Sequence, residues 1–315
     1  MIRQGVFALV LGMAHPCIGQ DGAIPISRLK ADAVLPLTLA PGAGASAAAV
    51  WTVNRTAGTA ISIAAKDNKV GAPVAIGGEP CSTIVSAFKS VWAPSCGSGS
   101  IARIDPDAAK VSATAKIAVA EPAGSIATAV GSIWVVTDRN GIVSRVDPDT
   151  NEAVAEIHIA GGASSIVFAN DALWVTSGTG NRLTRVNPKN NEVIESIEVG
   201  PKPGRLAAGD GAVWTLNQGD GSVSRVDAST NKIVATIKIG EKAAAGEIAA
   251  GDGSVWVSAP GLPLVRIDTR TNKVAQQFGG EGGGAVLLAH GSLWLAAGPH
   301  TMWRIDPKLV AGMRP

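Results

Sequence analysis

The chain of 315 residues contains no tyrosine and only four histidines, and charged residues make up only 17% of it. Lysine and arginine nearly balance aspartate and glutamate, so the formal net charge is +2, and basic residues form no run. Because nucleic acids and acidic membrane surfaces are bound through clustered positive charge, neither is an expected partner. An apolar stretch as long as a transmembrane helix is also missing, so no membrane span is predicted.

The sequence also lacks the signatures of common catalytic sites. It has no HExxH zinc motif, no GxSxG nucleophile elbow and no pair of histidines at the spacing of metal ligands. The glycine-rich segments at 279–280 and 282–284 are followed by strand patterns. A phosphate-binding loop needs a helix after it, so these glycines do not form one. The sequence therefore predicts neither a catalytic residue nor a metal ligand.

What the sequence does contain is a short phrase, such as SVW or SIW, that returns seven times. Its tryptophans are Trp51, Trp92, Trp134, Trp174, Trp214, Trp256 and Trp294. A fixed period of about 40 residues is typical of a repeat architecture.

Each repeat holds four short runs rich in Val, Ile and Thr, in which apolar residues alternate with polar or small ones. This is the strand pattern, and the repeats show no helical periodicity. The segment Asp-Pro-Asp-Thr-Asn at 147–151 has Pro at the second turn position and an Asn able to take positive φ, which predicts a tight hairpin. Four antiparallel strands form one propeller blade, so we predict an all-β, seven-bladed β-propeller.

The last repeat reaches Pro315 without room for a fourth strand. Residues 33–39 lie where a complete repeat has its outer strand. We expect this N-terminal segment to complete the last blade, which joins the two ends of the ring and removes an exposed edge. Residues 21–315 would then form a single propeller domain.

Two rows of repeated side chains are interpreted as scaffold. The tryptophans are expected to pack between adjacent blades rather than form a ligand-stacking cage. About a dozen residues after each later tryptophan comes an arginine in a phrase such as RVDP, and these are Arg103, Arg145, Arg185, Arg225, Arg266 and Arg304. We expect the arginines to pair with neighbours or cap the turn; a ring of arginines that binds an anion is the alternative.

The first 20 residues have the pattern of a secretory signal peptide, with a basic start, an apolar run at 5–14 and a polar exit. Cys17 leaves a lipoprotein as the alternative. Cys81 and Cys96 fall opposite one another on the predicted hairpin of the second blade, within reach of a disulfide. A bridge fits an exported chain, and two reduced, buried cysteines are the alternative. We expect a periplasmic or secreted monomer.

Function is predicted to lie where the repeats differ from one another. The loops that enter each innermost strand and those that follow each Trp strand form one face of the disc, and they vary from blade to blade. Such variation favours a binding face, and ordinary solvated loops are the alternative. Glu247 stands out because it begins an inner strand beside the channel. The candidates are Arg55, Glu79, Glu121, Asp138, Arg139, Asn181, Lys202, Arg205, Gln218, Asp220, Glu247 and His300.

The segments GSIWVVT at 131–137, VSRVDPDTN at 143–151 and AEIHI at 155–159, with their copies, resemble the YVTN-type β-propeller repeat family, which is WD40-like. The chain is also similar to the virginiamycin B lyase (streptogramin lyase) superfamily. The resemblance covers residues 33–315 and implies the propeller fold. The lyase group implies a metal-assisted elimination that opens a cyclic peptide ester, using a histidine and acidic residues around the channel. No histidine falls in a loop entering an inner strand, so no catalytic residue carries over.

Two functional hypotheses follow. In the first, the protein is an exported, non-catalytic propeller without a cofactor, whose loop face binds a protein, a peptide or a small ligand. In the second, it is a virginiamycin B lyase-like C–O lyase or a hydrolase, with a divalent metal such as Mg²⁺ in the central channel. Convergence of Glu247, Glu121 and a histidine at the channel mouth would favour the second.

Overall fold

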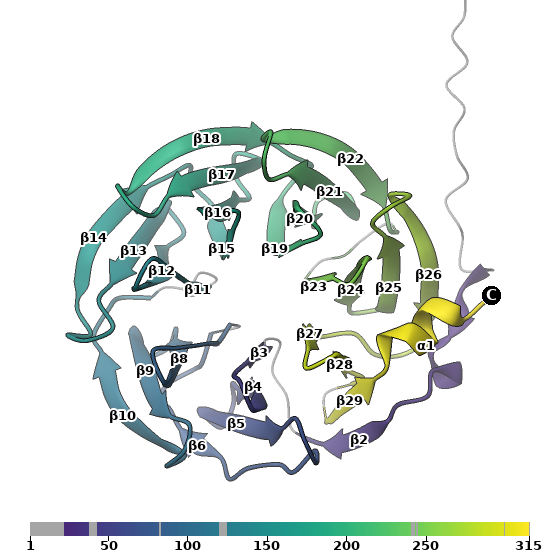
Figure 1. Cartoon of the computed structure of the whole chain (residues 1–315), viewed down its shortest axis with the longest axis horizontal. Coiled ribbons are helices and arrows are strands. Elements are labelled where there is room, and N and C mark those ends of the chain that lie inside the picture. The colour runs from purple at the N-terminus through teal and green to yellow at the C-terminus, as the bar shows by residue number, and fades with distance from the viewer. Residues whose placement is uncertain are drawn as a thin grey trace, which may run out of the picture.

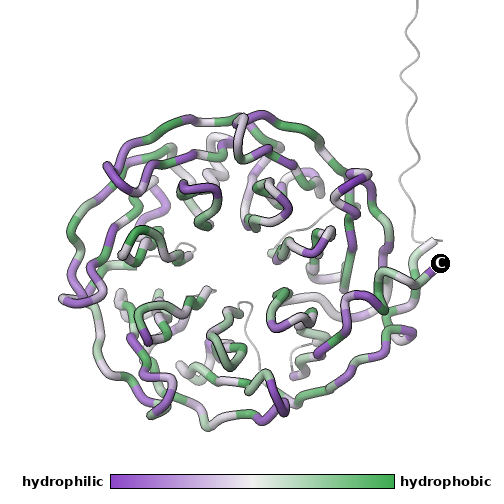
Figure 2. Tube along the Cα trace, viewed as in Figure 1, coloured by the Kyte–Doolittle hydropathy of each residue, from purple (hydrophilic) through white to green (hydrophobic). Residues whose placement is uncertain are grey.

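Seven β-sheets surround a central axis, which confirms the predicted seven-bladed β-propeller (Figure 1). The computed structural model describes residues 22–37, 43–81, 83–119, 125–240, 243, 245–298 and 300–314. The predicted signal peptide at 1–20 and Glu121 lie outside these residues. Hydrophilic residues gather at the turns, and hydrophobic ones follow the strands between them (Figure 2).

The strands of the first four blades follow one another along the chain. Blade 1 contains β3 (Ala43–Ala45), β4 (Ala49–Asn54), β5 (Thr59–Ala64) and β6 (Val74–Ala75). Blade 2 contains β7 (Val85–Ala87), β8 (Ser90–Ser95), β9 (Ser100–Asp105) and β10 (Lys110–Ala115). Blade 3 contains β11 (Ile126–Ala129), β12 (Ser132–Asp138), β13 (Ile142–Val146) and β14 (Ala153–His158). Blade 4 contains β15 (Ala163–Ala169), β16 (Ala172–Ser177), β17 (Arg182–Asn187) and β18 (Glu192–Glu198).

The remaining blades continue the same order. Blade 5 contains β19 (Pro203–Gly209), β20 (Ala212–Asn217), β21 (Ser222–Asp227) and β22 (Lys232–Lys238). Blade 6 contains β23 (Glu247–Gly251), β24 (Ser254–Ala259), β25 (Leu262–Asp268) and β26 (Lys273–Gly279). Blade 7 contains β27 (Val286–Ala289), β28 (Ser292–Ala296) and β29 (Thr301–Ile305).

An N-terminal strand completes blade 7, as the sequence predicts. Strand β2 (Ala33–Pro36) pairs antiparallel with β29, with Leu35 opposite Met302. The strand ends at Pro36, and residues 38 and 39 of the predicted segment lie outside the described residues. The first and last parts of the chain thus share one sheet, which closes the ring.

Three short elements at the chain ends were not predicted. Strand β1 (Ile24–Pro25) adds a fifth, parallel strand to blade 6, and the 3-10 turn η2 (Ile26–Arg28) follows it. After β29 the chain forms α1 (Pro307–Gly312), whose Val310 is buried in the same apolar cluster as Ile24 and Phe278. Both ends therefore pack beside blades 6 and 7 (Figure 1). Elements this short leave no periodic pattern in a sequence.

The tryptophans pack inside the ring, as expected, and those of blades 2 to 7 each lie against an arginine from the adjacent strand. All seven indole rings are buried, with at most 2% of the residue exposed. In blades 2 to 7 the guanidinium carbon lies between 5.0 and 5.9 Å from the ring centroid. Facing strands place the two residues directly opposite each other, as with Trp92 and Arg103. This geometry allows a cation–π contact and assigns both rows to the scaffold.

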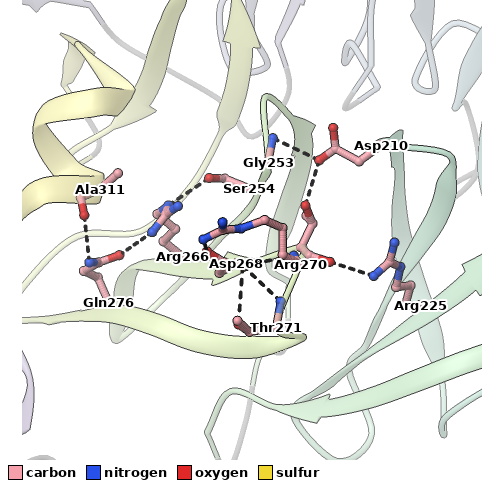
Figure 3. Close-up of polar contacts among 11 residues, drawn as sticks. Asp210, Arg225, Gly253, Ser254, Arg266, Asp268, Arg270, Thr271, Gln276 and Ala311 are labelled. Carbon is pink, nitrogen blue, oxygen red and sulfur yellow. Dashed lines mark hydrogen bonds and ion pairs between the residues drawn. The ribbon is translucent and has the colours of Figure 1, made fainter.

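The same arginines connect neighbouring blades. Arg185 donates from Nη1 to Oδ1 of Asn231 at 2.8 Å. Arg225 donates to the carbonyl oxygen of Thr269 at 2.7 Å, in the hairpin turn of blade 6 (Figure 3). The acceptor Asn231 has a φ of 61°, as its turn position requires. The turn residues thus shape their own hairpin and also bind the arginine of the preceding blade.

Blade 6 ends this series differently. Arg266 donates to Oε1 of Gln276 at 2.9 Å within its own blade, and the Gln276 amide donates to the carbonyl oxygen of Ala311 at 3.3 Å (Figure 3). Here the arginine is linked through Gln276 to helix α1, whereas in blades 2 to 5 it bonds directly to the hairpin turn of the next blade. Blade 7 resumes the pattern, since Arg304 donates to Oδ1 of Asn68 in blade 1 at 2.9 Å.

Candidate functional site

A central cavity of about 270 Å³ runs between the innermost strands. Equivalent positions in five blades, on the innermost strand or within two residues before it, lie nine residues before the tryptophan of each repeat and hold Thr83, Ser125, Ser165, Arg205 and Glu247. The Thr83 and Ser125 hydroxyls accept hydrogen bonds from backbone N–H groups of the next blade, at 3.1 and 3.0 Å. The channel is therefore uneven, with hydroxyls on blades 2 to 4 and charged groups on blades 5 and 6.

A larger cavity opens on the loop face, where loops enter the innermost strands of blades 4 to 6. Its volume of about 890 Å³ lies within the range of small-molecule sites. We call it the groove. It is lined by Gly162, Ser164, Gly178, Thr179, Asn181, Pro201, Lys202, Pro203, Gly204, Arg205, Gln218, Ala245 and Glu247. Five of the predicted site residues meet here: Asn181, Lys202, Arg205, Gln218 and Glu247.

Backbone contacts of Lys202 hold the middle of the groove together. Its N–H donates to Oδ1 of Asn181 at 2.9 Å, and its carbonyl oxygen accepts from the N–H of Gln218 at 3.0 Å. Pro201 and Pro203 flank it and restrict the backbone on both sides. Loops from blades 4 and 5 are thereby fixed to each other, and the groove is preformed.

Arg205 and Glu247 form an ion pair between blades 5 and 6. Nε of Arg205 lies 2.9 Å from Oε1 of Glu247, and only 18% and 13% of the two side chains are exposed. Burial raises the pKa of Glu247 above the ordinary glutamate value, and the positive charge of Arg205 opposes this rise. Both residues line the groove and the central channel. The pair therefore stands in the wall between the two cavities.

Other predicted residues pair away from the groove. Arg55 and Glu79 form an exposed ion pair at 3.0 Å between blades 1 and 2. Asp220 pairs with Lys238 at 2.6 Å within blade 5. Asp138 accepts from the backbone N–H of Asn140 at 2.7 Å and so shapes its own turn.

Two further candidates have backbone contacts at the loop face. The carbonyl oxygen of Arg139 accepts from the N–H of Gly162, which places the Arg139 turn beside the groove. The carbonyl oxygen of His300 accepts from the N–H of Leu37 at 2.9 Å, which ties its turn to the strand that closes the ring.

Several residues that line the groove were not predicted, among them Pro201, Pro203 and Thr179. The segment Gly-Pro-Lys-Pro-Gly at 200–204 does carry a signal, because it contains two prolines where blade 4 has Gly-Gly-Ala at 161–163. Comparing this loop between repeats would have identified it.

The predicted disulfide is present between Cys81 and Cys96, whose Cα atoms are 5.3 Å apart. It joins the loop before β7 to the end of β8, close to Glu79. The three described histidines are exposed and lie outside both cavities, with His158 at the end of β14 and His290 and His300 in turns of blade 7. In the described part of the chain, no three His, Cys, Asp or Glu residues gather as a metal site would require.

None of the helices in the described residues has the length and apolar character needed to cross a membrane. No model of a known protein family matches this chain, and no curated protein sequence matches it either.

Solved structures do match it, at low sequence identity. Streptogramin B lyase has a TM-score of 0.70 and 16% identity, over 85% of this chain and 93% of that one. Virginiamycin B lyase from Staphylococcus aureus has a TM-score of 0.72 and 17% identity, over 86% and 97%. BamB from Moraxella catarrhalis has a TM-score of 0.62 and 13% identity, over 85% and 83%. The chain therefore has a virginiamycin B lyase-like β-propeller fold.

Proposed function

We propose that this protein is an exported, non-catalytic binding protein that holds a peptide or a small ligand in the groove over blades 4 to 6. The observation that carries the proposal is the convergence of five variable residues, in loops and at strand starts of three blades, in one preformed cavity. The tryptophans and arginines serve the ring, whereas the groove residues differ from blade to blade. Residues under packing constraint repeat in such a fold, so those that vary are available for binding.

The construction of the groove supports recognition without large rearrangement. Prolines on both sides of Lys202 and the contacts from Asn181 and Gln218 restrict its backbone before any ligand arrives. A site ordered in advance loses less conformational entropy on binding. The wall of glycines and prolines also leaves room for a ligand backbone to approach closely.

Export is supported by the disulfide between Cys81 and Cys96, because such bonds persist in oxidising compartments. We propose a periplasmic or secreted location on this basis. The lyase-like alternative gains no support from the described histidines, because none of them lines the central channel. His158 ends the outer strand β14, and His290 and His300 lie in turns of blade 7.

Affinity selection tests the proposal. A defined pool of hexapeptides is passed over immobilised wild-type protein, Thr179→Trp and Thr114→Trp, and bound peptides are identified by mass spectrometry. Thr179 is exposed and lines the groove, whereas Thr114 is exposed on outer strand β10 of blade 2. We expect the wild type and Thr114→Trp to enrich the same peptides and Thr179→Trp to lose them. Enrichment unaffected by Thr179→Trp contradicts a binding groove, and no enrichment at all excludes a peptide as its ligand.

A further inference from the structure

Three groove residues other than glycine, Asn181, Lys202 and Ala245, have a positive φ, and of these three Lys202 alone carries a charge. Lys202 has a φ of 51°, in the left-handed region where a side chain crowds the backbone. The equivalent position of blade 4, three residues before the inner-channel position of its repeat, is Gly162, with a φ of 82°. Glycine adopts this conformation at no steric cost. Blade 5 therefore carries a lysine at a position where the fold would be better served by glycine.

The fold makes no visible use of the lysine side chain. The two hydrogen bonds that anchor this residue, to Asn181 and Gln218, come from its backbone, which glycine would supply equally well. Lys202 is exposed, and within the described residues its ammonium group takes part in none of the ion pairs or hydrogen bonds. A strained residue without a structural role points to a function at the site where it is kept.

Charge indicates what the lysine would hold. Among the residues that the structure describes, three charged ones line the groove, namely Lys202, Arg205 and Glu247. Arg205 and Glu247 neutralise each other at 2.9 Å, so the described lining keeps one positive charge, at Lys202. One fixed positive charge matches a ligand with one negative charge. A phosphate group, with a charge near −2 at neutral pH, would need a second cation.

The geometry points to a carboxylate-bearing ligand, whose single negative charge pairs with Lys202 while its body lies against Pro201, Pro203 and Ala245. The inference rests on the proposed function and names the ligand class of the same groove. The carboxylate belongs either to the C-terminus of a peptide or to a small organic acid, and the chemistry is the same for both.

The test uses the hexapeptide pool in two forms, with free and with amidated C-termini, and butyrate and inorganic phosphate as small probes. Binding to the folded wild type, Lys202→Gly and Lys202→Arg is measured by affinity selection for peptides and by NMR titration for small probes. We expect the wild type to prefer free C-termini by about tenfold or more, as for a hydrogen bond to a charged group. Lys202→Gly should lose this preference, and Lys202→Arg should keep it. If the natural ligand is a small organic acid instead, the peptides should show no preference, and butyrate should bind to the wild type and Lys202→Arg but not to Lys202→Gly.

Thermal melts of the same variants separate this role from a structural one. Lys202→Gly should melt at the same or a higher temperature than the wild type, because glycine relieves the left-handed conformation. A lower melting temperature would show that the lysine serves the fold and would overturn the inference. Tighter binding of phosphate than of butyrate would also overturn it. Peptides that depend on Thr179 but bind equally in free and amidated forms would overturn the carboxylate assignment and leave the proposed binding function intact.

Discussion

Replacing Arg205 by alanine should destabilise the protein in a way that depends on pH. The substitution leaves Glu247 only 13% exposed and without its ion-pair partner at 2.9 Å. Breaking a buried pair from one side costs about 3–5 kcal/mol when the remaining charge stays ionised. Glu247 can instead take up a proton, since burial already raises its pKa. Protonation of Glu247 therefore limits the loss of folding stability at low pH.

The sign of the effect follows from proton linkage. In the variant, the folded-state pKa of Glu247 rises further above its unfolded value of about 4.3. Between these two values the folded protein binds more protons than the unfolded chain, so its stability falls as the pH rises. The free energy of unfolding of Arg205→Ala should be only slightly below that of the wild type at pH 5. The difference should grow by at most about 1.4 kcal/mol per pH unit. We expect it to reach about 3 kcal/mol at pH 8.

Thermal melts at pH 5, 6, 7 and 8 measure the deficit. For a chain of this size, 3 kcal/mol corresponds to a fall in melting temperature of about 6 °C. Arg55→Ala is the matched control, because its pair with Glu79 is 41% and 65% exposed and should be worth less than about 1 kcal/mol at any pH. Replacing both partners, as in Arg205→Ala with Glu247→Leu, should recover most of the stability. A deficit for Arg205→Ala that stays constant from pH 5 to 8 would refute the reasoning.

Three further predictions concern the scaffold. Asn231→Gly keeps the left-handed turn but removes the acceptor for the arginine of blade 4, so thermal melts should show a loss of about 1.5 kcal/mol in stability. Asn231→Ala should cost more, because alanine disfavours the φ of 61° at this position. Reducing the Cys81–Cys96 disulfide, which closes a separation of 15 residues, should lower stability by about 3 kcal/mol, and an unchanged melting temperature with reductant would contradict this. Hydrogen bonds led by that from the Ser229 hydroxyl lower the pKa of Asp227 to about 2, so its stabilisation is present above pH 4 and lost as the pH falls toward 2. Asp227→Ala should accordingly melt below the wild type at pH 7, and most of this gap should be lost by pH 2; a gap as large at pH 2 as at pH 7 would argue against the assignment.

Most of the ring could be predicted because its signals are local. The alternation of apolar and polar residues defines each strand, and the turn at 147–151 forms because Asn151 adopts a φ of 61°. The closing strand at Ala33–Pro36 was also predictable, since it has the pattern that the last repeat lacks. The two-residue strand β1 and helix α1 were missed because elements of that length have no period to detect.

The candidate site could be predicted only as a set of positions. Arg55, Asp138 and Asp220 meet the same sequence criteria as Asn181 and Lys202, yet the first three pair within or between other loops. The backbone conformation of Lys202 was likewise invisible, although the glycine at the same place in blade 4 was a clue.

The sequence by itself determined the repeat, the number of blades, the closing strand and the placement of Cys81 opposite Cys96, because each follows from spacing along the chain. Only the tertiary structure decided that loops from blades 4 to 6 enclose one groove, with Arg205 and Glu247 in its wall. The physical reason is that strand and turn patterns act over a few residues. The distance between loops about 40 residues apart depends instead on how each twisted blade packs against the next around a closed ring.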